Sequence, residues 1–229
     1  MERGQEGERL TTKVGRKESK RTLRKGTSDP RTVEAHFDEW ADSYDATLTG
    51  WQYNAPEETA ALLAPCLPRE GARVFDVGCG TGLFGETLAR HMKPAPVVLH
   101  GVDISSVSLK RAEKRGVYER LARHDLNVLP LPVTDDSQDA AAVVGVLSYF
   151  PDPEPLMRDL CRAVKPGGYI AFSMRSDLWE EREFDAMIAR LEAAGRWRRR
   201  HVSQPQPYLP GNDEFADEIA VFYTLCRVM

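Results

Sequence analysis

Apolar and polar positions follow two alternating patterns along most of this chain. Short apolar runs with the length of a β-strand alternate with longer stretches in which apolar residues recur every three or four positions. This succession predicts an α/β fold with a doubly wound, mostly parallel sheet of about seven strands. The strands are expected at Arg73–Val77, Val97–Asp103, near Leu121–His124, at Asp139–Val146 and Tyr169–Arg175, and the helices between them at Leu83–His91, Ser106–Arg115, Pro155–Val164 and Leu178–Ala194.

The C-terminal part of the chain breaks this alternation. A turn is expected at the Lys-Pro-Gly-Gly run Lys165–Gly168. Further on, two strand-like runs, Trp197–Ser203 and Glu218–Val228, are joined by a Pro-rich loop with no helical pattern between them. Because two strands without a crossover helix form a hairpin, one of them is expected to run antiparallel in the sheet.

Two helices are predicted before the first strand. The first covers Thr32–Tyr44, and the second covers Glu57–Leu67. The helical spacing of the first places four apolar or aromatic residues on one face: Phe37, Trp40, Ala41 and Tyr44. Aromatic stripes of this kind usually pack against a core, so spacing alone leaves both packing and ligand contact open.

Charge divides the chain into two regions. Residues 1–29 carry nine Lys and Arg against five acids, whereas the remainder carries 22 bases against 30 acids. The N-terminal region has few apolar residues, so we expect a disordered basic tail at 1–29 and one folded domain at 30–229. A solvated tail is favoured over an RNA-binding arm or a targeting signal, and the acidic body argues against a nucleic-acid partner.

Several classes of site and location are disfavoured by composition. No apolar run approaches the length of a membrane span, so no membrane association is expected. The cysteines are scattered without C-x-x-C spacing, which argues against a metal site or a disulfide framework and favours a reducing, cytoplasmic location. They are Cys66, Cys79, Cys161 and Cys226.

The most informative segment is a glycine-rich loop between the first strand and the following helix. Gly78, Gly80 and Gly82 allow a tight turn and close approach to a ligand, and the helix start offers free N–H donors. Asp103 ends the next strand, where an acid is well placed to bind ribose hydroxyls. Together these features predict a site for a cofactor that contains adenosine.

Two kinds of cofactor fit this spacing. Gly80–Gly85 matches the dinucleotide pattern G-x-G-x-x-G, with Asp103 at a suitable distance. However, Gly78 and Cys79 separate the strand from that pattern, and no Tyr-x-x-x-Lys pair of a short-chain dehydrogenase occurs. A nicotinamide oxidoreductase is therefore the weaker interpretation.

The run from Asp76 to Gly82, DVGCGTG, resembles motif I of the class I S-adenosylmethionine-dependent methyltransferases, which have a Rossmann-like fold. The resemblance implies that this loop wraps the amino-acid end of S-adenosylmethionine. Asp76 either lies near the amino group of the cofactor or caps the loop, and Cys79 is a small filler. The residues expected to bind the cofactor are Trp40, Tyr44, Asp76, Gly78, Cys79, Gly80, Gly82, Asp103, Ile104, Asp125, Leu126, Gly145 and Val146.

The same resemblance gives roles to other segments. The run from His36 to Asp45 resembles the lid helix of small-molecule methyltransferases, which implies an N-terminal helical lid at 30–68 with Tyr44 over the cofactor. Asp103 would bind the ribose, Ile104 and Asp125-Leu126 would contact the adenine, and Gly145-Val146 would lie where methyl group and acceptor meet. Longer phrases, among them 37–45, 99–103, 117–121, 144–148 and 190–195, resemble the methyltransferase-like family of the Williams–Beuren syndrome chromosomal region, which implies no particular acceptor.

The resemblance implies a methyltransferase that acts on O or N of a small or medium-sized acceptor. The competing interpretations are an S-adenosylmethionine-binding protein without turnover and a methyltransferase that acts on protein or RNA. A hydroxyl or amine acceptor would benefit from a base. His36, His124, Tyr149 and Asp177 are candidates, and no spacing selects one of them. Oligomeric state is left open.

Overall fold

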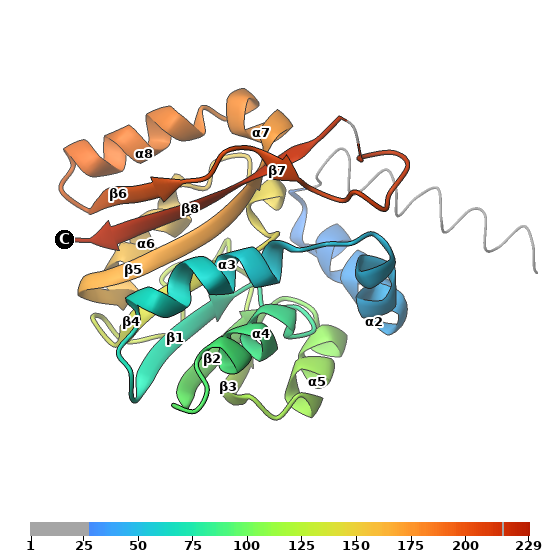
Figure 1. The fold of residues 1–229 in the computed structure, drawn as a ribbon, viewed down its shortest axis with the longest axis horizontal. Helices are drawn as coiled ribbons and strands as arrows, with labels where there is room; N and C mark the ends of the chain where they lie inside the picture. Colours follow the sequence, from blue (N-terminus) through green and yellow to red (C-terminus); the bar gives the residue numbers. More distant parts are fainter. Residues whose placement is uncertain (1–27, 217) are drawn as a thin grey trace, which may run out of the picture.

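The computed structural model describes residues 28–216 and 218–229. Its centre is one sheet in the order β3-β2-β1-β4-β5-β8-β6, with β7 paired to β8 (Figure 1). Strands β1 to β5 pair in parallel, and β8 runs antiparallel to each of its partners. The predicted fold class, with its antiparallel C-terminal strand, is therefore confirmed. The strands are β1 Ala72–Val77, β2 Val97–Asp103, β3 Tyr118–Arg123, β4 Gln138–Val143, β5 Val164–Arg175, β6 Trp197–Val202, β7 Gln206–Pro207 and β8 Ala220–Val228.

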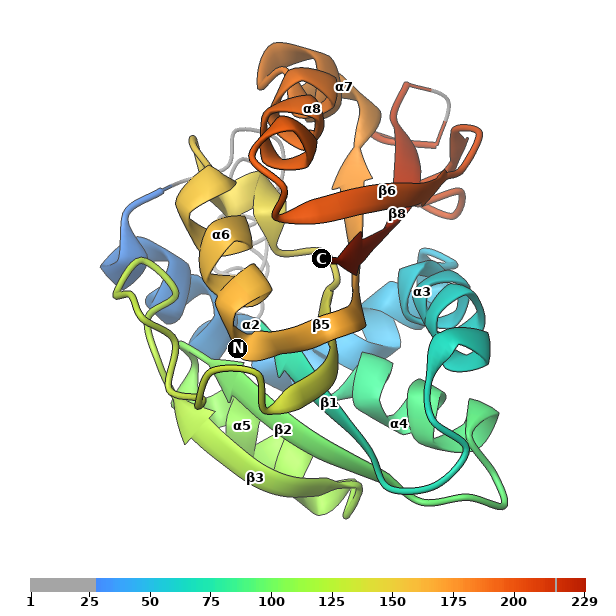
Figure 2. The same ribbon diagram turned by 90° about the vertical axis from the view of Figure 1, so that its left-hand side faces the viewer.

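Helices cover both faces of this sheet (Figure 2). One apolar cluster lies under α6, α7 and α8, and a second lies under α3 and α4. Neighbouring strand residues alternate between the clusters, as Val74 faces the second and Phe75 the first, because successive side chains point to opposite faces. The helices are α2 Pro30–Gly50, α3 Ala55–Leu63, α4 Leu83–His91, α5 Ser106–Lys114, α6 Glu154–Ala163, α7 Ser176–Glu181 and α8 Phe184–Ala193, with short 3-10 turns η1 Ala64–Cys66 and η2 Leu147–Tyr149.

The first helix is longer than the sequence pattern indicated. Asp29 caps α2 by accepting a hydrogen bond from the Thr32 backbone N–H at 2.9 Å, and Pro30 occupies the first helical position. The helix runs to Gly50 and packs against α5. The basic tail predicted at residues 1–29 lies, apart from its last two residues, outside the described residues.

Two local predictions were wrong. The helix expected at Leu178–Ala194 is divided into α7 and α8 by Glu183, whose φ is +49°. Arg182, beside this break, donates hydrogen bonds to the carbonyls of Leu147, Ser148 and Phe150. The run Lys165–Gly168 is not a separate turn but lies within β5. The pairing of β4 passes there from Val164 to Tyr169, so the four residues bulge out of register.

Candidate cofactor site

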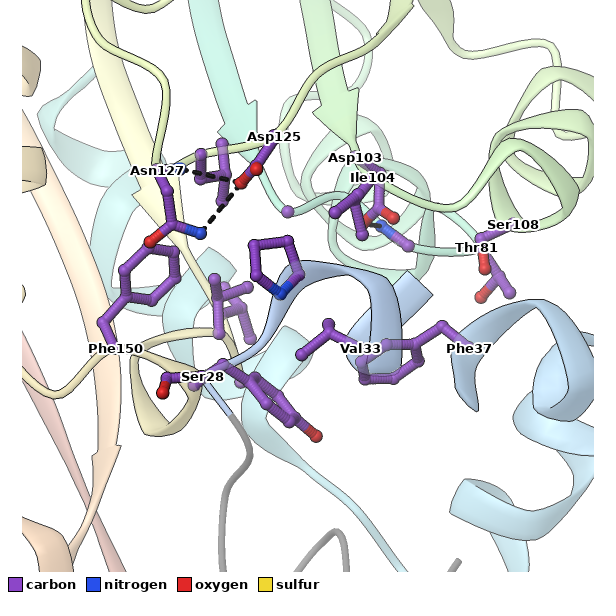
Figure 3. A pocket seen from close by; sticks show the side chains of 18 of the residues that line it. Ser28, Val33, Phe37, Thr81, Asp103, Ile104, Ser108, Asp125, Asn127 and Phe150 are labelled. Atoms are coloured by element: carbon purple, nitrogen blue, oxygen red, sulfur yellow. Dashed lines mark hydrogen bonds between the residues drawn. The ribbon is translucent and has the colours of Figure 1, made fainter. Parts of the chain in front are cut away.

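A pocket opens where the chain leaves the carboxyl ends of the parallel strands. Its walls come from the loops after β1, β2, β3 and β4, and α2 covers it (Figure 3). Its empty space amounts to about 740 Å³ when the open solvent at its mouth is included. β2 and β4 lie on opposite sides of β1, so the pocket sits at the topological switch point of the sheet, the usual ligand site of doubly wound folds.

The glycine loop after β1 makes its turn with left-handed backbone. Gly78, Gly80 and Gly82 have φ of +72°, +51° and +86°, a region that other residues rarely adopt. A Cβ at Gly78 would overlap Val146, so the absence of a side chain lets the loops after β1 and β4 approach closely. The sequence therefore needs glycine at this position for two independent reasons.

Asp103 ties the glycine loop to the end of β2. Its Oδ2 accepts a hydrogen bond from the Gly80 N–H and its Oδ1 from the Ser105 N–H, both at 2.8 Å. Burial raises the pKa of this carboxyl to about 6, although the two N–H donors oppose the shift. Each carboxylate oxygen has a second lone pair, so Asp103 can also accept hydrogen bonds from ligand hydroxyls.

Asp76 lies beneath the loop and not in the pocket wall. It is 1% exposed, and its Oδ2 accepts a hydrogen bond from the Tyr118 hydroxyl at 2.5 Å. Burial raises the pKa of Asp76 to about 7, against the effect of that hydrogen bond. Tyr118 was not expected from the sequence. Its ring packs against Gly82, Gly85 and Gly101, and a Cβ at any of these three glycines would meet it.

We expect Asp76→Asn to stabilise the protein at alkaline pH. The unfolded chain carries an ionised Asp76 above pH 4, whereas the folded chain resists ionisation up to about pH 7. Ionisation of Asp76 therefore lowers the free energy of unfolding of wild type at high pH, and wild type recovers this stability as the pH falls. The variant should unfold with a free energy about 1–3 kcal/mol greater than wild type at pH 8, and the difference should vanish near pH 4. Denaturant melts at both pH values measure it; a difference independent of pH would contradict the assignment.

Acidic residues spaced along one face of α2 hold this helix over the pocket. This spacing was visible in the sequence, but its partners were not, because they lie far along the chain. Asp45 binds the Thr81 hydroxyl at 2.6 Å and Arg115 at 2.5 Å, so it joins α2 to the glycine loop and to the end of α5. The other pairs are Glu34 with Arg123, Asp38 with the Ser105 hydroxyl, and Asp42 with Arg111.

Aromatic rings line the underside of α2. Phe37 and Tyr44 border the pocket, and the Phe37 ring lies 5.5 Å from that of Tyr149. Trp40 does not border it; its ring packs 4.7 Å from Tyr44 and 5.7 Å from Trp51. Trp40 thus packs against the Tyr44 ring without lining the pocket.

The pocket brings together most of the residues that the sequence pointed to. Those that line it are Tyr44, Gly78, Gly80, Asp103, Ile104, Asp125, Leu126, Gly145 and Val146. Four expected residues do not line it: Trp40, Asp76, Cys79 and Gly82. Lining residues that sequence reasoning did not select include Ser28, Val33, Thr81, Asn127 and Phe150; Asn127 donates to Asp125 at 2.8 Å (Figure 3).

The candidate bases do not converge on the pocket. His124 bonds the carbonyl of Val128 at 2.8 Å, and Asp177 pairs with Arg175 at 2.5 Å. His36 packs against Phe37 and Trp40, and burial lowers its pKa. Tyr149 lines the pocket, but burial raises its pKa. Within the part of the chain that the structure describes, no group of three His, Cys, Asp or Glu side chains could hold a metal ion, and no helix could cross a membrane.

Comparison with known proteins agrees with this architecture. Residues 75–172 match the model of a methyltransferase domain. Human methyltransferase-like protein 27 is 36% identical over 166 residues, which cover 70% of this chain and 66% of that protein. A ubiquinone biosynthesis O-methyltransferase from Alkalilimnicola ehrlichii is 36% identical over 115 residues, or 48% of this chain and 45% of its own length.

Solved structures show the same fold. An S-adenosylmethionine-dependent methyltransferase from Thermotoga maritima, described as a possible histamine N-methyltransferase, superposes with a TM-score of 0.57 at 19% identity. The match covers 83% of this chain and 97% of that one. The sheet order, the matched domain and the human relative agree with the resemblance read from motif I, and the chain belongs to the class I methyltransferases.

Proposed function

We propose that this protein transfers a methyl group from S-adenosylmethionine to O or N of a small or medium-sized acceptor. The observation that carries the proposal is Asp103. Its carboxylate is held by two backbone N–H groups at the switch-point pocket and keeps lone pairs for ligand hydroxyls. The matched methyltransferase domain supports the choice of cofactor.

The pocket fits this cofactor in its chemistry. Asp103 would take the ribose hydroxyls, and Ile104, Leu126 and Phe150 offer apolar surface for adenine beside the polar pair of Asp125 and Asn127. The left-handed glycines leave room for the amino-acid end at the loop. S-adenosylmethionine supplies a methyl group that is already activated on a sulfonium, and the faces of Phe37 and Tyr44 would favour that cation by about 0.5–2 kcal/mol.

The chain itself would contribute position and shielding more than proton transfer. Closing α2 over the pocket excludes water, and alignment of acceptor and methyl group can supply several kcal/mol of the barrier reduction. Asp103 and Asp125, which line the pocket, already accept hydrogen bonds from the chain. The absence of a base among the described lining residues is consistent with a displacement that needs little acid–base help.

Product formation distinguishes the competing functions. Purified protein incubated with S-adenosylmethionine and extracts of small molecules, protein or RNA should release S-adenosylhomocysteine with the first. Removing residues 1–27 keeps the Asp29 cap of α2 and should leave this activity intact. Turnover with the protein or RNA extract that is lost on this deletion would favour a macromolecular substrate, and binding without turnover in any pool would favour a binding protein. The cytoplasmic location stays a prediction.

We expect Asp45→Ala to speed release of S-adenosylmethionine. The substitution removes the link from α2 to Thr81 and Arg115, whose side chain is 15% exposed. Partly buried pairs are worth more than exposed ones, so the dissociation rate should rise about three- to tenfold. Stopped-flow fluorescence measures it. Asp42→Ala is the matched control, since the Asp42 side chain is 86% exposed; equal effects of the two variants would contradict the role of Asp45.

A further inference from the structure

Four tyrosines from distant segments meet around the Gly145 end of the pocket. Tyr44 of α2 and Tyr149 of η2 line the pocket itself. Tyr53, between α2 and α3, packs its ring 5.9 Å from that of Tyr208, which follows β7. Each is partly buried, and burial raises the pKa of all four, so they present neutral phenols.

Tyr53 reaches the backbone just after β4. A Cβ at Gly145 would lie 2.6 Å from the Tyr53 hydroxyl, and the Gly145 φ is +72°. The Gly145 N–H is fixed by the Ser173 hydroxyl at 2.9 Å. This glycine therefore makes room for the Tyr53 hydroxyl, which reaches the end of the pocket that the family resemblance assigns to the meeting of methyl group and acceptor.

Tyr53 also borders a second cavity. This cavity is open to solvent, amounts to about 950 Å³ when that open solvent is included, and has polar walls that include Thr49, Asn54 and Glu58. Tyr53 contributes to its wall while its hydroxyl lies at Gly145. Tyr53 thus lies between a cavity that is open to solvent and the Gly145 end of the first pocket.

A buried arginine lies beside the tyrosines. Arg175, at the end of β5, is 4% exposed, pairs with Asp177 at 2.5 Å and lies 5.9 Å from the centre of the Tyr208 ring. Burial opposes its charge most strongly, but the hydrogen bond to Asp177, the Asp177 charge and the nearby Tyr208 and Tyr149 together raise its pKa, so it stays protonated. Its field lowers the pKa of Tyr149, in part offsetting burial. Such a field favours a developing oxygen anion over an ammonium group.

The described lining residues offer no base for the acceptor. None of them is a histidine, and the two carboxylates among them are those that the proposed function assigns to the cofactor, Asp103 to its ribose and Asp125 beside its adenine. An aliphatic hydroxyl, whose pKa is far above neutral, would keep its proton at such a site. A phenol is far more acidic than an aliphatic hydroxyl and can lose its proton to solvent water before it enters the pocket, and its ring would pack edge-to-face against tyrosines.

Resting on the proposed function, we propose that the acceptor is a phenol, which binds between Tyr53 and Tyr149 and is methylated on oxygen. The phenol gives its proton to solvent water before it enters the pocket. The phenolate oxygen then forms its bond to the methyl carbon, while the carbon–sulfur bond breaks and leaves its electron pair on sulfur. Tyr53 acts as a specificity residue, because its hydroxyl can hydrogen-bond the acceptor oxygen at Gly145.

Three probes with one ring test this assignment: 4-nitrophenol, 4-nitrobenzyl alcohol and 4-nitrobenzylamine. Calorimetry measures the binding of each to the full chain saturated with S-adenosylhomocysteine, and a turnover assay measures S-adenosylhomocysteine release. The phenol should bind at least tenfold more tightly than the alcohol or the amine and be methylated fastest. Tyr53→Phe should weaken phenol binding about five- to tenfold and leave the S-adenosylhomocysteine Kd within twofold. Tyr169→Phe, on β5, is the control that should change neither.

The outcomes separate the two proposals. If S-adenosylhomocysteine does not bind, the proposed function itself fails. If it binds but the alcohol or the amine is preferred, if no probe binds, or if a folded Tyr53→Phe protein behaves as wild type, the phenol assignment is overturned and the methyltransferase proposal stands. The probe comparison on wild type needs no variant, so it decides the matter even if Tyr53→Phe does not fold.

Discussion

Asp103→Ala should weaken S-adenosylmethionine binding about 5- to 150-fold, which corresponds to about 1–3 kcal/mol. The substitution removes the carboxylate expected to accept the ribose hydroxyls, and it leaves the Gly80 and Ser105 N–H groups without their partner. Hydrogen bonds to a charged group are the stronger kind, which sets the upper end of this range. Calorimetric titration of wild type and variant measures the change.

Two controls accompany that measurement. Asp103→Asn keeps the shape and one acceptor oxygen, so its loss should be smaller than that of Asp103→Ala. Because the pKa of Asp103 is about 6 in the folded protein, wild-type affinity should fall as pH drops below 6, where the carboxylate is protonated. Asp103→Ala should lack that fall. Unchanged affinity in the alanine variant would refute the ribose assignment.

Gly85→Ala should lower the free energy of unfolding by about 1–3 kcal/mol, although alanine is the better helix former. A Cβ at Gly85, inside α4, would overlap the Tyr118 hydroxyl and lie 2.5 Å from its Cζ. Tyr118 cannot retreat easily, because Gly101 and Gly82 enclose the same ring and its hydroxyl is bonded to Asp76. Thermal or denaturant melts of the two proteins give the difference.

A matched glycine and a double variant test the cause. A Cβ at Gly50, at the end of α2, would meet nothing within 4 Å, so Gly50→Ala should be near neutral. Tyr118→Leu removes the atoms that a Cβ at Gly85 would meet. The double variant with Gly85→Ala should therefore be less unstable than the sum of the single changes. Simple additivity would show that the clash with Tyr118 is not the cause.

Local patterns determined what could be predicted of the fold. The bounds of α4 and β2 agree with the sequence because Gly82 and Asp103 mark their ends. The break between α7 and α8 could not be predicted, since it coincides with Arg182 hydrogen bonds to carbonyls more than thirty residues away. The bulge at Lys165–Gly168 looked like a turn because Pro and Gly are typical of both.

In the candidate site, too, local sequence patterns could be predicted and contacts between distant residues could not. Gly78, Gly80 and Asp103 were found because they are close in sequence or at a fixed spacing from one strand end to the next. The pairing of Asp76 with Tyr118, 42 residues on, and of Asp45 with Arg115, 70 residues on, depends on the packed sheet and lid. Trp40 shares its helix face with Tyr44. Only the folded structure shows that the Trp40 ring packs against the rings of Tyr44 and Trp51 and does not line the pocket.

Calorimetric titration of the purified full chain with S-adenosylmethionine, S-adenosylhomocysteine and NAD tests the central claim most directly. We predict about micromolar binding of the first two and none of NAD, because the pocket is shaped by the loop around Gly78 and by the Asp103 carboxylate. Binding of NAD alone, or of none of the three, would contradict it.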